Sequence, residues 1–169
     1  MQKIFIYFIL ISSTLFADDI LALLQKVENN SALHMSHKQQ TFLCQPYGVE
    51  TIDVLISRTD VNSTCKTFLN EFRQSHPKEK FYAAKKLHIK QQYSVSGVDG
   101  KCLLNLSSSH SYSEALLEVG YARIYPNLDF KDELLAYRFE KAVKRAKVKK
   151  EGFWSDENII NCFLTPKKK

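Results

Sequence analysis

The chain has 169 residues, 44% of them hydrophobic and 25% charged, which is the composition of one globular domain and excludes a disordered or fibrous chain. It has only five glycines, and no glycine-rich phosphate-binding loop of the Rossmann or P-loop type occurs. The formal net charge of +6 is a moderate basic excess, below that of a dedicated nucleic-acid-binding domain.

The first seventeen residues have the pattern of a signal peptide. Lys3 gives the positive charge, residues 4–11 form an apolar run, and Ala17 is the small residue before the expected cleavage site. The alternative is an uncleaved anchor, but this run is shorter than the roughly 20 residues of a spanning helix. We therefore predict a signal peptide at 1–17 and an exported protein, periplasmic or secreted, with no transmembrane segment in its mature part.

Export changes the interpretation of the cysteines. All four follow the leader: Cys44, Cys65, Cys102 and Cys162. An even number in an oxidising compartment predicts disulfides, and the sequence does not distinguish the three possible pairings. The alternative for Cys102 is a plain core residue, because it alternates with Leu104 and Leu106 on one face of a predicted strand.

The first mature segment, residues 18–27, is predicted to be a helix. Its apolar residues have helical spacing and would share one face: Ile20, Leu23, Leu24 and Val27. His34 and His37 follow, three residues apart. On a helix this spacing would suit a metal-binding pair, but no third ligand lies nearby in the sequence, and solvated histidines are the simpler interpretation.

The middle of the chain is predicted to be mainly helical. Polar capping residues and proline at a first turn set the expected starts of the helices. In chain order we expect an extended segment or loop at 39–49 with a turn at 46–48, a helix or short strand at 51–59, a helix at 63–74 capped by Ser63, and a helix at 77–86.

The last part has clearer signals. A hairpin is predicted over 87–106 with its turn at Asp99 and Gly100. Ser111 and Glu114 form a capping-box pattern that opens a short helix ending at Gly120. A brief strand at 121–125 and a long helix at 128–150 follow, the latter with one apolar stripe: Leu135, Phe139, Ala142 and Ala146.

This order of elements resembles the C-terminal half of the staphylococcal nuclease-like (thermonuclease) family. Three stretches carry the resemblance: Val-Asp-Gly-Lys-Cys-Leu-Leu at 98–104, Tyr-Ser-Glu-Ala-Leu-Leu-Glu-Val-Gly-Tyr-Ala at 112–122, and the segment from Glu-Lys-Ala at 140–142 to Gly-Phe-Trp-Ser at 152–155. It covers about residues 80–158. It implies an α+β fold, an OB-like small barrel with packed helices including a long C-terminal helix, and metal-assisted, usually calcium-assisted, cleavage of DNA and RNA.

The first half departs from the family's catalytic pattern. The aspartate-glycine-aspartate-threonine metal loop and the segment joining an arginine to acids are absent, and Lys101 matches the family's second arginine. Lys101 is therefore the one catalytic candidate, and no metal ligands are predicted. An active nuclease would need calcium and a rebuilt site using some of Asp53, Asp60, Asp99 and Lys101. The short stretch from 31 to 59 leaves open whether the barrel is complete.

A basic cluster lies near the end of the long helix. Its candidate ligand-binding residues, for nucleic acid or another anionic ligand, are Lys141, Lys144, Arg145 and Lys147. The alternative is a solvated helix face whose charges complement the helix dipole. Three aromatic residues could stack bases or belong to the core: Tyr121, Tyr125 and Phe130. Trp154 is expected to anchor the tail.

The predicted organisation is a signal peptide at 1–17, an N-terminal helix and divergent segment at 18–60, a nuclease-like α+β core at 61–158 and a C-terminal tail at 159–169. The leading functional hypothesis is an exported, non-catalytic nuclease-like protein that binds nucleic acid or another anionic ligand. The alternatives are an active metal-dependent nuclease with a rebuilt site, and an envelope protein-interaction module.

Overall fold

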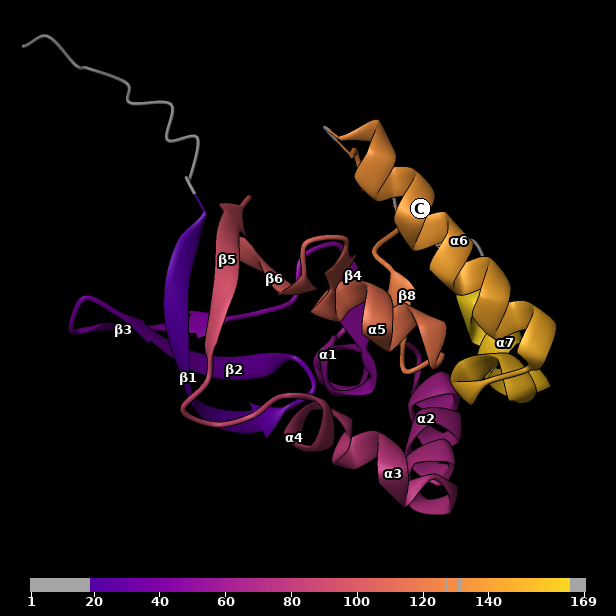
Figure 1. Cartoon of the computed structure of the whole chain (residues 1–169). Coiled ribbons are helices and arrows are strands. Elements are labelled where there is room, and N and C mark those ends of the chain that lie inside the picture. Colours follow the sequence, from indigo (N-terminus) through magenta and orange to yellow (C-terminus); the bar gives the residue numbers. More distant parts are fainter. Residues whose placement is uncertain (1–18, 127, 131, 165–169) are drawn as a thin grey trace, which may run out of the picture.

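The computed structural model describes residues 19–126, 128–130 and 132–164, which form an α+β fold (Figure 1). Its main sheet has six antiparallel strands in the order β3-β2-β1-β5-β6-β7, and β4 pairs with β8 separately. The strands are β1 (Ile20–Asn29), β2 (Ala32–His37), β3 (Gln40–Cys44), β4 (Val49–Thr51), β5 (Gln92–Val98), β6 (Lys101–Ser107), β7 (His110–Ser111) and β8 (Ala122–Ile124). The helices are α1 (Ile52–Ser57), α2 (Ser63–Ser75), α3 (Pro77–Lys80), α4 (Tyr82–Lys86), α5 (Tyr112–Glu118), α6 (Glu133–Lys149), η1 (Gly152–Ser155) and α7 (Glu157–Leu164).

The helix predicted at 18–27 is wrong, because this segment is the central strand β1. It pairs with β2 on one side and with β5 on the other. Ala22 and Leu24 are fully buried, Leu21 just before them is 61% exposed and Leu23 between them is partly exposed, which is the two-residue period of a strand. The spacing of its apolar residues is compatible with a helix as well as a strand. The segment is a strand because it pairs with β5, which lies about 70 residues later in the sequence.

The sheet curls so that the end of β3 approaches β6. Just after β3, Pro46 forms an isolated parallel bridge with Cys102 of β6. Tyr47 donates its N–H to the Cys102 carbonyl at 2.8 Å, and Cys102 donates to the Gln45 carbonyl at 2.9 Å. A disulfide joins Cys44 to Cys102 at the same place. Cys102 is thus both a buried core residue and half of a disulfide.

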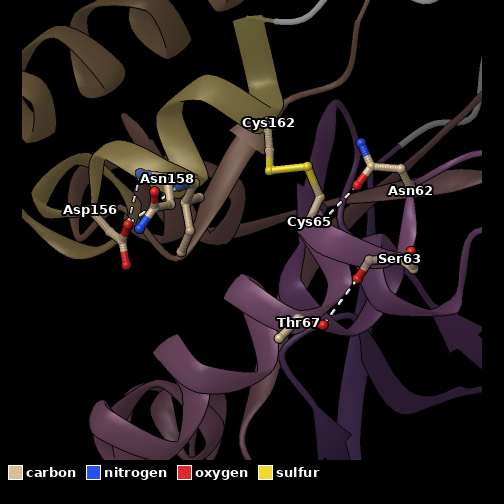
Figure 2. The surroundings of a disulfide bond; sticks show 8 residues. Asn62, Ser63, Cys65, Thr67, Asp156, Asn158 and Cys162 are labelled. Carbon is tan, nitrogen blue, oxygen red and sulfur yellow. Dashed lines mark hydrogen bonds between the residues drawn. A yellow bond between two sulfur atoms is a disulfide. The ribbon is translucent and has the colours of Figure 1, made fainter.

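A second small core lies among helices from the middle and the C-terminal part of the chain. It is formed by side chains of α1, α2, η1 and α7: Ile52, Leu55, Leu69, Phe72, Phe153 and Ile159. The second disulfide, Cys65–Cys162, joins α2 to α7 (Figure 2). Beside it, Asn62 caps α2 by accepting the N–H of Cys65 at 2.7 Å. The predicted disulfides are confirmed, with both pairings now defined.

Two glycines allow the chain after α5 to pack closely against the start of η1. Gly120 has φ +66° and Gly152 has φ +55°, and a Cβ on either would collide with the backbone of the other segment. Phe153 donates its N–H to the Gly120 carbonyl at 2.8 Å across this contact. The ring of Phe153 is fully buried, whereas Trp154 is only partly so. Phe153, rather than the predicted Trp154, is therefore the principal anchor of the C-terminal segment.

Most other predicted elements are present with shifted ends. The capping box of Ser111 and Glu114 is formed, and the hairpin turns at 99–100, but its first strand begins only at Gln92. The long helix begins at Glu133, after its cap Asp132, rather than at 128. The predicted tail contains α7, and residues 165–169, like the predicted signal peptide at 1–17, lie outside the described residues. No helix in the described part of the chain is long and apolar enough to cross a membrane.

Candidate functional site

The residues predicted for a rebuilt nuclease site have other partners in the fold. Asp53 accepts from Arg73 Nη2 at 2.7 Å, and Asp60 pairs with Arg58. Lys101, at the start of β6, is exposed and donates to the side-chain oxygen of Gln45. Asp99 lies in the turn before it, with φ +47°. The two acids of the α1 region are thus each matched to a different arginine.

Histidines and acids do not gather into a metal site in the described residues: no group of three or more possible ligands is found there. His34 and His37 lie on β2, where residues three apart point to opposite faces. His34 Nε2 lies 2.9 Å from Glu28 Oε2, and His37 Nδ1 donates to the Leu21 carbonyl at 2.8 Å. The helical metal pair considered from the sequence is therefore wrong.

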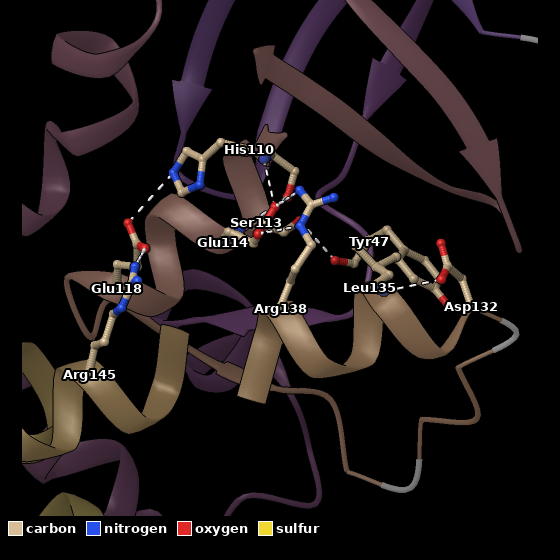
Figure 3. Close-up of polar contacts among 10 residues, drawn as sticks. Tyr47, His110, Ser113, Glu114, Glu118, Asp132, Leu135, Arg138 and Arg145 are labelled. Carbon is tan, nitrogen blue, oxygen red and sulfur yellow. Dashed lines mark hydrogen bonds and ion pairs between the residues drawn. The ribbon is translucent and has the colours of Figure 1, made fainter. Parts of the chain in front are cut away.

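The position of α6 is fixed by polar contacts with α5 (Figure 3). Asp132 caps α6 by accepting the N–H groups of Leu134 and Leu135. Arg138 donates its Nε–H to Glu114 at 2.8 Å and pairs with the second oxygen as well. Burial opposes ionisation of Glu114, but hydrogen bonds from Arg138 and Ser111 outweigh it and hold the pKa of Glu114 below its ordinary value.

With its apolar stripe turned to the core, α6 presents a mixed cationic and apolar face to solvent. We call this the outer face of α6; it borders an open pocket of about 580 Å³ and comprises Tyr137, Glu140, Lys141, Lys144, Arg145, Val148 and Lys149. Tyr137 is 59% exposed and Val148 77% exposed. The ammonium of Lys141 lies 5.8 Å from the centre of the Tyr137 ring. An exposed aromatic ring thus shares this helix face with four cations and one acid, and Lys141 lies beside it.

Three of the four predicted ligand-binding residues belong to this face: Lys141, Lys144 and Arg145. Arg145 also donates to Glu118 Oε1 at 2.9 Å, and its side chain remains 55% exposed (Figure 3). Lys147 lies elsewhere on the helix, with its ammonium 4.5 Å from the centre of the Trp154 ring. Lys147 therefore helps to hold η1 against α6 rather than extending the outer face.

The aromatic residues considered for base stacking mostly belong to the core. Phe130 packs edge-on against Tyr47 and Phe139, and Tyr121 against Tyr82. Tyr125 is an exception, since half of it is exposed. The exposed ring beside the cations is Tyr137, which the sequence analysis missed. A signal for it existed, because Tyr137, Lys141, Lys144 and Val148 recur at helical spacing opposite the buried stripe.

No protein-family model matches the chain, and a search of curated proteins also gives no match.

Proposed function

We propose that this protein is an exported, non-catalytic relative of the staphylococcal nuclease-like family that binds single-stranded nucleic acid along the outer face of α6. The observation that carries the proposal is that the exposed ring of Tyr137 shares one face of α6 with Lys141, Lys144 and Arg145. Single-strand-binding proteins combine these two features, cations that follow the phosphates and aromatic rings on which bases stack.

The family assignment is supported by the order of the elements. The β5–β6 hairpin, the capped helix α5, the short strand β8, the long helix α6 and the turn η1 follow one another as the resemblance implies. The curl that brings the segment after β3 against β6 is what an OB-like barrel of five strands would require. We propose such a barrel, formed by β1, β2, β3, β5 and β6.

We propose that the protein has no phosphodiesterase activity at the rebuilt site considered from the sequence. Hydrolysis needs a cation held by several oxygen ligands together with charge stabilisation at the phosphate. The candidate acids Asp53 and Asp60 are each paired with an arginine, and Lys101 donates to Gln45 rather than pointing to a carboxylate cluster. Two disulfides agree with folding in an oxidising compartment, and we propose the periplasm or the exterior.

The test is the binding of a fluorescein-labelled single-stranded DNA to the purified protein, followed by fluorescence anisotropy at several salt concentrations. Affinity should fall with salt, and each lost phosphate contact should reduce the slope of log K against log salt by about 0.7. The double variant Lys141→Glu with Lys144→Glu should reduce both affinity and slope. The matched control changes two exposed lysines of α4 by the same charge, Lys85→Glu with Lys86→Glu, and should bind nearly as the parent does.

Tyr137→Ala separates stacking from charge. Loss of one stacked base typically costs about 1–3 kcal/mol of binding free energy, and the salt slope should stay unchanged.

The same DNA, incubated with the protein and calcium and then with a chelator, tests for cleavage. Chelator-sensitive cleavage that Lys101→Ala abolishes would favour the nuclease alternative. Absence of any saturable DNA binding would favour the protein-interaction alternative.

A further inference from the structure

A second pocket lies at the end of the sheet where the β5–β6 hairpin turns. It has a volume of about 310 Å³, which is within the range of small-ligand sites. We call it the hairpin pocket; the residues that shape it are Ile20 of β1, Phe42 and Leu43 of β3, Val95 of β5, and Lys101 and Cys102 of β6. None of these residues belongs to the outer face of α6.

The interior of the hairpin pocket is apolar. Val95 and Cys102 are buried, and Phe42 is partly so. Leu43 is 50% exposed, one of the large apolar side chains that the fold leaves open to water. Gly97 and Gly100 complete the lining, and a Cβ added at Gly100 would meet no atom within 4 Å, so the rim there is open. An apolar hollow with an open rim and an exposed leucine indicates a ligand site.

Lys101 is the one polar side chain among the described lining residues. Its ammonium donates to the side-chain oxygen of Gln45, which holds it beside the pocket. A lysine supplies one compact positive charge rather than the two-pronged contact of an arginine, and so matches a single negative charge. Because no other lining side chain offers a hydrogen bond, the rest of the hollow suits an aliphatic chain, which has no polar group to satisfy.

We propose that the hairpin pocket binds a free monocarboxylate with a short aliphatic chain. The carboxylate lies at Lys101, and the chain lies against Phe42, Leu43 and Val95. The pocket is separate from the proposed nucleic-acid site, so either proposal can fail without the other.

The experiment is a titration of the full-length mature protein, disulfides intact, with sodium octanoate, monitored by two-dimensional methyl NMR. Saturable shifts of the methyl groups of Leu43, Val95 and Ile20 are expected. Octanol, which lacks the charge, and acetate, which lacks the chain, should each bind at least about tenfold more weakly. Lys101→Met should lower octanoate affinity to that of octanol, while Lys86→Met on α4 is the matched control and should leave it unchanged.

Three results would overturn the proposal: no saturable shift with octanoate on the folded parent protein, equal affinity for octanol, or octanoate affinity unaffected by Lys101→Met. A peptide ending in leucine that binds more tightly than octanoate would also overturn it, because the occupant would then be a protein terminus. If Lys101→Met does not fold, the comparison of octanoate, octanol and acetate on the parent still decides whether the carboxylate and the chain are both recognised.

Discussion

Glu50 of β4 and Arg123 of β8 face one another as direct partners in the two-stranded sheet. Arg123 donates through Nε at 2.8 Å and through Nη2 at 2.7 Å to the same oxygen, Glu50 Oε2. Arg58 pairs with the other oxygen, and the Glu50 side chain is 1% exposed. One buried carboxylate thus binds two arginines from different parts of the chain, and Arg58 has a second partner in Asp60.

We predict that Glu50→Gln destabilises the protein by about 3–5 kcal/mol, because Arg123 loses its carboxylate partner and Arg58 keeps only Asp60. Urea unfolding measures the change. Glu71→Gln on the exposed side of α2 is the control and should lie within about 0.5 kcal/mol of the parent. A cost for Glu50→Gln as small as the control's would show that water reaches the two arginines.

Phe153→Ala is predicted to cost about 3–5 kcal/mol, the usual range for removing a buried phenylalanine ring. Its ring is fully buried and packs edge-on against Phe72 and Phe163. Trp154→Ala should cost less, since Trp154 keeps part of its surface in water. Thermal unfolding of both variants checks the order, and a larger effect for Trp154 would contradict the assignment of Phe153 as the anchor.

Removing the Cys65–Cys162 disulfide by a double change to alanine should destabilise the protein by about 2–5 kcal/mol, because the bond closes a loop with a sequence separation of 97 residues. The loss should be concentrated in α7. Hydrogen exchange should therefore become faster in α7 while the central strand β1 stays protected. Equal acceleration in both elements would mean that α7 and the sheet unfold together.

Two buried glutamates are predicted to respond to pH in opposite directions. Burial raises the pKa of the Glu79 carboxyl, against the opposing effects of Arg73 and Asn30. Its contribution to stability is therefore present in acid and is lost as the pH rises through the folded pKa. The lowered pKa of Glu114 has the opposite consequence: its contribution is present near neutral pH and is lost as the pH falls.

Urea unfolding of Glu79→Gln and Glu114→Gln at about pH 7 and about pH 4 tests this pair. On acidification the parent should gain stability relative to Glu79→Gln and lose its advantage over Glu114→Gln. If the parent instead gained stability relative to both variants, the inference for Glu114 would be wrong, and if it lost stability relative to both, the inference for Glu79 would be wrong.

Local signals in the sequence predicted local structure well. The capping box of Ser111 and Glu114 and the turn at Asp99 and Gly100 involve residues within a few positions of one another, and both are present. The strand β1 could not be predicted in this way, since its partner β5 is distant in sequence. The long helix was predicted to begin too early because Leu128 and Phe130 are apolar. They are apolar because they pack on the core in the segment before α6.

The candidate site was predictable only in part. The cations of α6 stand out in composition, but only the orientation of the helix separates Lys147 from Lys141, Lys144 and Arg145. Tyr137 was not predicted because it lies on the face of the helix opposite the apolar stripe, Leu135, Phe139, Ala142 and Ala146. The pairing of the cysteines depends on which strands and helices meet, which no local pattern encodes.

The two disulfides interleave along the chain, since Cys65 lies between Cys44 and Cys102, and Cys102 lies between Cys65 and Cys162. Any single cut of the backbone between Cys44 and Cys162 therefore leaves at least one disulfide joining the two pieces. A cut between Cys65 and Cys102 leaves both. A protease that nicks one loop between Cys44 and Cys162 would thus release no fragment, and the severed chain would stay one covalent molecule able to re-form its contacts.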